Sequence, residues 1–202
     1  HWRWDSDRLA SIEICENVID LTVRKLQTLP QETQNLLMLA ACIGNRFDLR
    51  VLSVVNERSP RRTAADLWEA IAQGMIIPLN EAYKIPLTLD ASTENEAEDA
   101  EIAKLPIRYT FLHDRVQQAA LALISPEIRQ DVRVQIGKLL LASTPPEDLE
   151  DSIFEIVNQL NAGAALMVHP QERQHLAQLN LMAARKAKAA SAWETASDYL
   201  DV

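Results

Sequence analysis

The sequence predicts a mainly α-helical fold that contains one pair of short antiparallel strands. Apolar residues recur at helical spacing before residue 75 and again from residue 114 onward. Between these regions, the segments "MIIPLNEAYKIPL" and "IRYTFL" are short and rich in β-branched or aromatic residues, which is typical of strands. Only four glycines occur, and two of them follow helical segments, where glycine commonly ends a helix.

Several segments of the first part predict helices in succession. Helical spacing runs over residues 17–29, and the next helical segment ends at Gly44. Asp48 is a suitable N-cap for a short helix, because its carboxylate can accept a hydrogen bond from a free backbone N–H. Thr63 is expected to cap the following helix, and Gly74 is expected to end it.

The stretch at about 85–104 is predicted to be a long solvated loop that joins the two strands. It contains the acidic run "DASTENEAEDAEIAK", which has no bulky apolar residue before Ile102. Three helices followed by a two-stranded antiparallel hairpin are the order of elements in a winged-helix domain. The sequence therefore predicts a winged-helix domain over residues 1–113, with the acidic stretch as the loop of its wing.

Residues 114–202 predict a second, purely helical region. Asp114 and Gln117 have the spacing of a capping box at the start of its first helix. Ser125 followed by Pro126 marks the start of the next helix. The last two helical segments, "HPQERQHLAQLNLMAARKAKAA" and "SAWETASDYL", carry small residues where helices pack closely. The predicted α-helical bundle thus resembles the start of a tetratricopeptide-like (TPR-like) array.

The composition argues against several classes of protein. A net charge of −9 and a pI near 4.9 disfavour a surface for nucleic acid or anionic lipid. The longest apolar run, "LLMLAACIG", is too short to span a membrane, and no signal peptide opens the chain. Cys15 and Cys42 are expected to be reduced core thiols, so we expect a cytoplasmic protein without membrane insertion. The abrupt start "HWRWD" and a helical pattern that reaches the last residues predict a fragment of a longer protein.

No motif for independent catalysis or metal binding occurs. The sequence lacks a Gly-rich phosphate loop, a nucleophile elbow and clustered Cys/His spacing, so we expect no catalytic residue, metal site or cofactor within the chain. His169 and His175 are expected to be solvated. His113 differs, because it lies just before a helix start, where free N–H groups and the helix dipole favour an anion. There it can bind a phosphate or simply cap the turn, whereas Asp114 is most simply an N-cap.

The segment "RYTFLHDRVQQAALALI" resembles the winged-helix histidine motif of STAND-class AAA ATPases, which in its best-known form is Met-His-Asp. Here the motif is Leu112-His113-Asp114. In that class, the histidine reaches the β-phosphate of ADP bound by an upstream ATPase core and holds the closed, inactive state. The resemblance therefore implies that His113 senses nucleotide, that Asp114 caps the helix at that site, and that the partner is an ATPase core earlier in the same chain.

Three longer segments are similar to one group of very large, cyanobacteria-type signalling proteins. They begin at "KLQTLPQETQNLL", "FLHDRVQQAALAL" and "IFEIVNQLNAGAA", and "HDRVQQAA" is their most specific part. Proteins of this group combine a serine/threonine kinase, a central AAA ATPase, sensor domains and a histidine kinase. The resemblance implies a kinase as the parent protein, with ATP or ADP and Mg in its upstream ATPase module. The phosphate-binding loop is absent from this chain and is expected upstream of His1.

Four functional hypotheses remain open from the sequence. The first is a non-catalytic regulatory arm that relays nucleotide state to kinase domains. The second is a protein-interaction module in which the winged helix is an inert spacer. The third is a DNA-binding winged helix, for which Arg58, Arg61 and Arg62 offer phosphate contacts, although Asp66, Glu69 and the acidic stretch oppose it. The fourth is an enzyme in its own right, which the absence of a nucleophile motif disfavours.

Overall fold

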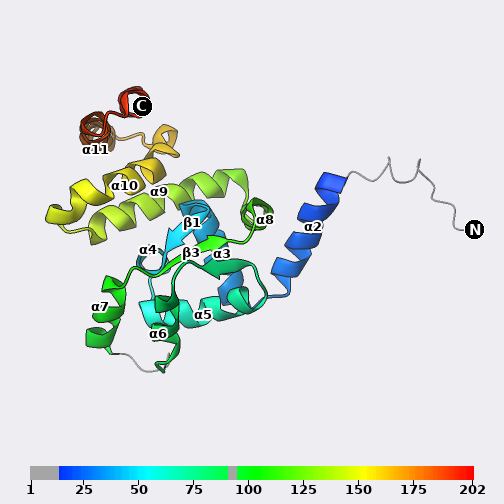
Figure 1. Ribbon diagram of the computed structural model, residues 1–202. Coiled ribbons are helices and arrows are strands. Elements are labelled where there is room, and N and C mark those ends of the chain that lie inside the picture. The colour runs from blue at the N-terminus through cyan, green and yellow to red at the C-terminus, as the bar shows by residue number, and fades with distance from the viewer. Residues whose placement is uncertain (1–13, 91–94) are drawn as a thin grey trace, which may run out of the picture.

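The computed structural model describes residues 14–90 and 95–202 (Figure 1). The first half contains, in chain order, α2 (Ile14–Gln27), α3 (Gln31–Ile43), β1 (Arg46–Asp48), α4 (Leu49–Val55), α5 (Pro60–Ala72), β2 (Ile76–Pro78), the 3-10 helix η1 (Glu81–Tyr83), α6 (Lys84–Leu87), α7 (Glu96–Lys104) and β3 (Arg108–Phe111). The second half contains α8 (Asp114–Ala122), α9 (Pro126–Ser143), η2 (Pro146–Asp148), α10 (Leu149–Asn161), η3 (Ala164–Leu166), α11 (Pro170–Ala189) and α12 (Trp193–Leu200). The prediction of a mainly α-helical fold is confirmed.

The strands form a three-stranded antiparallel sheet in the order β1-β3-β2. The predicted pairing of the two strand segments is confirmed, since Ile77 lies opposite Thr110. The first segment is shorter than predicted, because the chain turns into 3-10 and α-helix soon after Pro78. Strand β1 was not predicted. It has three residues, too few for an alternating pattern, and it exists because Phe47 pairs with Tyr109.

The prediction of a solvated loop over the acidic stretch is wrong for most of its length. Glu96–Lys104 is a helix, α7, whose N-cap Asn95 accepts a hydrogen bond from the Glu98 backbone N–H at 3.3 Å. Ile102 is buried in the core, and Glu98 pairs with Arg61 of α5. The acidic composition of the stretch led to the wrong prediction, because the helix depends on Arg61, which is distant in sequence. Residues 91–94 of the expected loop lie outside the described residues.

Several predicted helix ends are confirmed. Gly44 follows α3, and its N–H donates to the Ala40 carbonyl. Asp48 caps α4 by accepting a hydrogen bond from the Arg50 backbone N–H at 2.8 Å. Ser125 caps α9 in the same way. These signals are local in sequence, so they could be recognised without knowledge of the tertiary structure.

The predicted start of α5 is wrong. The helix begins earlier, with Ser59 as N-cap accepting from the Arg62 N–H, and Thr63 lies buried within the helix. Ser59 precedes a proline, which is favoured in the first helical turn. The predicted end at Gly74 is confirmed: Gly74 has a φ of +66°, which favours glycine, and the next residue closes the turn by donating to the Ala70 carbonyl.

The hydrophobic core has two clusters that meet at α3 and α4. The first lies among α2–α5, the sheet and α8, and includes the stacked rings of Phe47 and Tyr109. The second lies among α9–α12 and also takes Cys42, Val51 and Val55 from the first half. Because the same two helices contribute to both clusters, the halves share an extensive apolar contact. The predicted domain division after residue 113 stays a prediction, although α8 packs into the first cluster.

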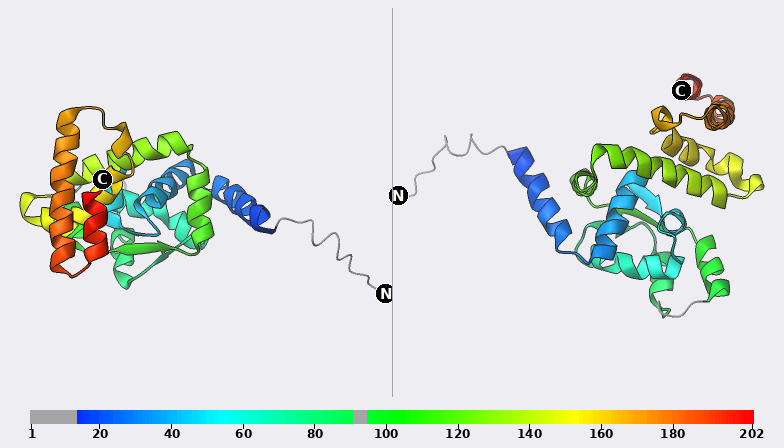
Figure 2. Two further views of the ribbon diagram at one scale, coloured as in Figure 1. Left: turned by 90° about the horizontal axis from the view of Figure 1, so that it is seen from above. Right: turned by 180° about the vertical axis from the view of Figure 1, so that it is seen from behind.

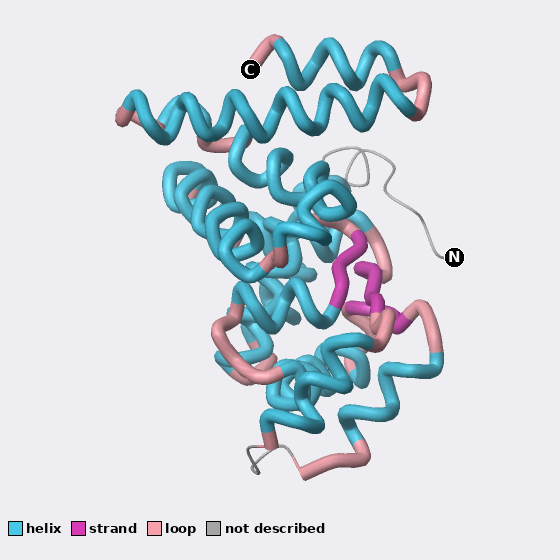
Figure 3. Tube along the Cα trace, turned by 90° about the vertical axis from the view of Figure 1, so that its left-hand side faces the viewer, coloured by secondary structure: helices cyan, strands magenta, loops and turns pink. Residues whose placement is uncertain are grey.

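The helices are arranged in layers around this core. Figure 3 shows α11 and α12 running antiparallel as an outer layer over the rest of the molecule. Helix α2 reaches away from the body at the opposite end, where it packs mainly against α8 (Figures 1 and 2). Within the described part of the chain, every helix is too short or too polar to cross a lipid bilayer.

Candidate functional site at the β3–α8 junction

The junction between β3 and α8 is held by two segments that are distant in sequence. The Phe111 N–H donates to the Asn45 carbonyl at 3.0 Å, and the Leu112 N–H donates to the Met75 carbonyl at 3.0 Å. Asn45 lies between α3 and β1, whereas Met75 follows α5. The backbone that leads to His113 is therefore fixed on both sides.

His113 occupies the N-cap position of α8, with an extended backbone (φ −144°, ψ 150°). Its side chain makes no capping hydrogen bond and is exposed, while its carbonyl accepts from the Val116 N–H at 2.9 Å. The first N–H groups of a helix have no partner within the helix, and together with the helix dipole they favour an anion. An imidazole at this position can donate a further hydrogen bond to the same anion. The arrangement can bind a phosphate presented from outside the chain.

The prediction that Asp114 caps this helix is wrong by one position. Asp114 is the first residue of α8, and its predicted capping-box partner Gln117 instead donates through Nε2 to the Ala41 carbonyl at 3.1 Å. Asp114 is exposed, and its negative charge in the first turn favours the helix. The exposed Arg115 beside it partly offsets that charge for an incoming anion.

The last turn of α3 connects this junction to the second half. Gln159 of α10 is 2% exposed, and its Nε2 donates to the Ile43 carbonyl at 3.1 Å. Its Oε1 accepts from the Arg133 Nε of α9 at 3.1 Å. The chain continues from Ile43 to Asn45, whose carbonyl accepts the hydrogen bond from β3. Gln159 was not found from the sequence, because a glutamine on a helix has no local pattern that marks it as buried.

Two carboxylates lie near the place where α4 faces α10: Asp48, which caps α4, and Glu155 of α10, which lines a hollow together with Arg50. Burial raises the pKa of Asp48 above its usual range, and the nearby Arg50 and Arg108 lower it only in part. Burial also raises the pKa of Glu155 of α10, and the charge of Asp48 raises it further. Both carboxylates therefore lie in surroundings that disfavour their charged forms.

The remaining candidate side chains lie away from this junction. His169 and His175 are exposed, as predicted, and His1 lies outside the described residues. Cys42 is buried as predicted, and burial raises the pKa of its thiol; the side chain of Cys15 is outside the described residues. Within residues 14–90 and 95–202, no group of three or more His, Cys, Asp or Glu side chains could hold a metal ion.

The three arginines that offered phosphate contacts are already paired within the fold. Arg61 is 2% exposed and pairs with Glu98, while Arg58 and Arg62 both pair with Asp66. A phosphate backbone would have to compete with these carboxylates for each guanidinium. This arrangement gives no support to the DNA-binding hypothesis.

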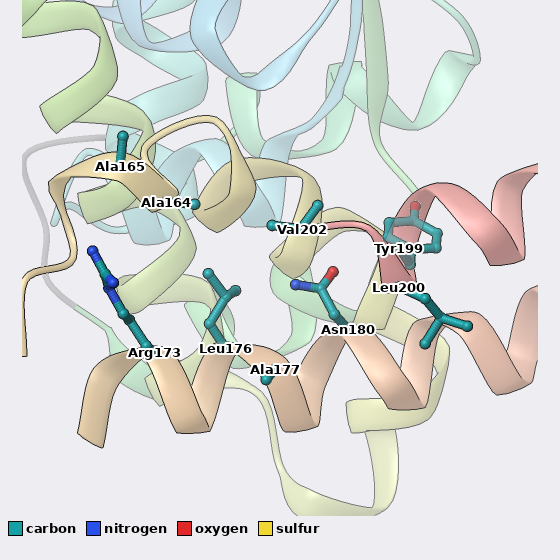
Figure 4. Close-up of a pocket in the computed structure, with 9 residues that line it drawn as sticks. All are labelled: Ala164, Ala165, Arg173, Leu176, Ala177, Asn180, Tyr199, Leu200 and Val202. Carbon is teal, nitrogen blue, oxygen red and sulfur yellow. The ribbon is translucent and has the colours of Figure 1, made fainter. Parts of the chain in front are cut away.

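A groove of about 470 Å³ lies between η3, α11 and α12 (Figure 4). Figure 4 shows Arg173 and Leu176 pointing from α11 toward the η3 segment, and Asn180 farther along α11 near Val202. Arg173 donates through Nε to the Met167 carbonyl at 2.7 Å, and Asn180 exchanges hydrogen bonds with Asn161. The remaining lining is mostly apolar: Ala164, Ala165, Ala177, Tyr199, Leu200 and Val202.

The comparisons with known proteins include a similarity to a signalling kinase. Over its whole length, the chain is 30% identical, across 230 aligned residues, to the hybrid signal transduction histidine kinase G of Dictyostelium discoideum. The chain is thus related in sequence to a signalling kinase. It spans about 7% of the length of that relative. No family model matches the chain, and no solved structure matches it.

Proposed function

We propose that this chain is the non-catalytic regulatory arm of a multidomain signal-transduction kinase. A winged-helix domain in the first half contacts an upstream STAND-type ATPase core, and a TPR-like helical region in the second half passes the nucleotide state to effector domains. The similarity to a hybrid signal transduction histidine kinase supports the signalling role. The kinase activity, the ATPase core and its ATP or ADP with Mg belong to the parent protein in this proposal.

The order of elements supports a winged helix in the first half. Helices α3, α4 and α5 precede the antiparallel β2–β3 pair, and β1 adds a third strand on the other side of β3. The second half supports a TPR-like region through the α11–α12 hairpin. There α11 buries the small residues Ala183, Ala184 and Ala187, which allow close helix packing.

The observation that carries the proposal is the exposure of His113 at the start of α8. A histidine that served only to cap the helix would bond the free N–H groups of the first turn, and His113 makes no such bond. Its imidazole is therefore available to a phosphate that those N–H groups also attract. A phosphate at this place would contact the junction that is fixed to Asn45, and through Ile43 and Gln159 to α10. In this proposal the arm can adopt two arrangements, and ADP binds one of them more tightly. ADP then shifts the equilibrium toward that arrangement by the difference between the two affinities.

The experiment is an ADP titration by calorimetry on the longer protein that includes the upstream ATPase core. His113→Ala should weaken ADP binding by about tenfold or more, because a hydrogen bond to a charged group contributes roughly 1.5–3 kcal/mol. His175→Ala is the matched control, since His175 is also exposed on a helix but lies on α11. The control should bind ADP as the unmodified protein does.

Equal ADP affinity in His113→Ala and in the unmodified protein would contradict nucleotide sensing. The second candidate function would then be favoured, in which the winged helix is inert and the helical half binds a protein partner. The groove between η3, α11 and α12 is the observation that favours this alternative. Substituting the exposed Leu200 with Asp in that groove would then abolish partner binding without changing ADP affinity.

A further inference from the structure

Helix α7 is attached to the rest of the molecule by little apolar contact. Ile102 is its one buried residue, with 4% of its surface exposed, and the other residues of α7 are exposed or half-buried. Figure 1 shows α7 at the edge of the molecule beside α4, and it also contacts α5. Burying one aliphatic side chain contributes little against the entropy cost of ordering nine residues. Other interactions must hold α7 in place.

Those interactions come from Arg61 of α5. Its Nη2 donates to the Glu98 carboxylate at 2.7 Å, and its Nε lies 3.6 Å from the Asp99 carboxylate. Its Nη1 also donates to the Asp90 carbonyl at 3.2 Å. One buried guanidinium thus binds the chain on both sides of the segment that leads into α7. The side chain of Arg61 is almost fully buried, whereas Glu98 is about half exposed.

The charges of Arg61, Glu98 and Asp99 disfavour a partly detached α7. A buried guanidinium is tolerated only while a carboxylate compensates its charge, since an unpaired buried charge costs several kcal/mol. When α7 lifts off, all three groups gain water together, so the open state avoids that cost. Salt screens the attraction more effectively once water reaches the pair, because the Debye length falls from about 10 Å at 0.1 M to about 3 Å at 1 M.

We propose that α7 is a detachable helix, held closed on α5 by the Arg61–Glu98–Asp99 cluster, which opens while the rest of the fold stays intact. The proposal does not depend on nucleotide sensing by His113. Opening separates Arg61 from both carboxylates. Arg61 lies at the N-terminal end of α5, near Arg58 and Arg62. It also uncovers the apolar contact of Ile102. Ionic conditions, or a charged partner that competes for Arg61, would therefore control which face of α5 is accessible.

Hydrogen exchange of the α7 amides, followed by mass spectrometry on this chain, tests the proposal. Glu98→Gln combined with Asp99→Asn should speed exchange in residues 96–104 at least tenfold. Roughly 1 M salt should speed it by a smaller factor in the unmodified chain, because the half-exposed Glu98 is screened while the buried Arg61 is screened much less. Glu101→Gln is the matched control, because Glu101 lies on the same helix, is exposed and pairs with the exposed Lys104. The amides of α3 and α8 should keep their protection throughout, which shows that the fold is intact.

A charge-free variant tests the mechanism from the other direction. Replacing Arg61 and Glu98 with Met and Asp99 with Leu removes the buried charges and adds apolar contact. Helix α7 should then stay protected, and its exchange should no longer respond to salt. The proposal is overturned if α7 in the unmodified chain exchanges only together with α3 and α8 at every salt concentration. Unchanged protection in the Glu98→Gln, Asp99→Asn variant, or an unprotected α7 at low salt, would overturn it as well.

Discussion

Replacing Gln159 with Leu tests how the two halves of the molecule are joined. Gln159 is buried and makes two hydrogen bonds, one to the Ile43 carbonyl of α3 and one from the Arg133 Nε of α9, both at 3.1 Å. Leucine has a similar volume and suits a helix, so the substitution removes the hydrogen bonds with little change in packing. Both former partners would remain at the contact between α3, α9 and α10.

The expected cost follows from these two bonds. A hydrogen bond contributes a net 0.5–1.5 kcal/mol, roughly, and a buried group left without a partner costs about 1–3 kcal/mol. The Arg133 guanidinium also donates to the Asn158 carbonyl and is half-buried, so it recovers part of its loss from water. The Ile43 carbonyl at the buried contact has less access to water. We therefore expect Gln159→Leu to lower the free energy of unfolding by about 2–4 kcal/mol.

Urea unfolding followed by far-UV circular dichroism measures this change. Gln178→Leu is the matched control, because Gln178 is exposed on α11 and the same substitution there should shift stability by no more than about 0.5 kcal/mol. Gln159→Glu separates the two bonds, since a carboxylate still accepts from Arg133 but cannot donate to Ile43. A Gln159→Leu variant no less stable than the control would refute the view that this side chain joins the halves.

Two further predictions concern the same contact region. Gly137→Ala should lower the melting temperature, because the added Cβ would lie 2.7 Å from Leu160 Cγ. We expect a net loss of about 1–2 kcal/mol in the free energy of unfolding, after the gain in helix propensity. A higher melting temperature would contradict the close approach of α9 to α10. Glu155→Gln should stabilise the protein at about pH 7 and have less effect as the pH falls toward 4, roughly. Burial raises the pKa of Glu155 above its ordinary value of 4.5, so the folded state binds its proton more tightly than the unfolded state does. Protonation of Glu155 therefore stabilises the folded state fully below the pKa of the unfolded state, and this stabilisation is lost as pH rises through the pKa of the folded state. Thermal melts of both proteins across this range measure the effect, and a stability difference independent of pH would contradict it.

Much of the secondary structure could be predicted because its signals are local. The N-caps at Asp48 and Ser125 and the helix end at Gly74 each depend on a few neighbouring residues. The start of α5 was misassigned because two residue types that favour capping, Ser59 and Thr63, lie one turn apart. The structure selects Ser59, since Pro60 fits the first turn, and Thr63 lies buried within the helix.

The candidate site could be predicted only in part. The position of His113 at a strand-to-helix junction followed from the change of hydrophobic period between "RYTF" and "VQQAALA". The exposure of its side chain and the anchoring of the junction to Asn45 and Met75 could not be predicted, since they depend on segments far away in the chain. For the same reason, Gln117 was expected to bond its own helix and instead bonds the Ala41 carbonyl.

The sequence by itself determined the helical character of the chain, the strand character of β2 and β3 and the position of His113 ahead of α8. These features depend on hydrophobic period and capping, which act within a few residues. The tertiary structure alone decided that Arg46–Asp48 is a strand, that the acidic stretch contains a helix and that Gln159 is buried. Each of these depends on a partner distant in sequence: β1 on β3, α7 on Arg61, and Gln159 on Ile43, 116 positions away. Such contacts form only when folding brings the partners together and removes water from around them.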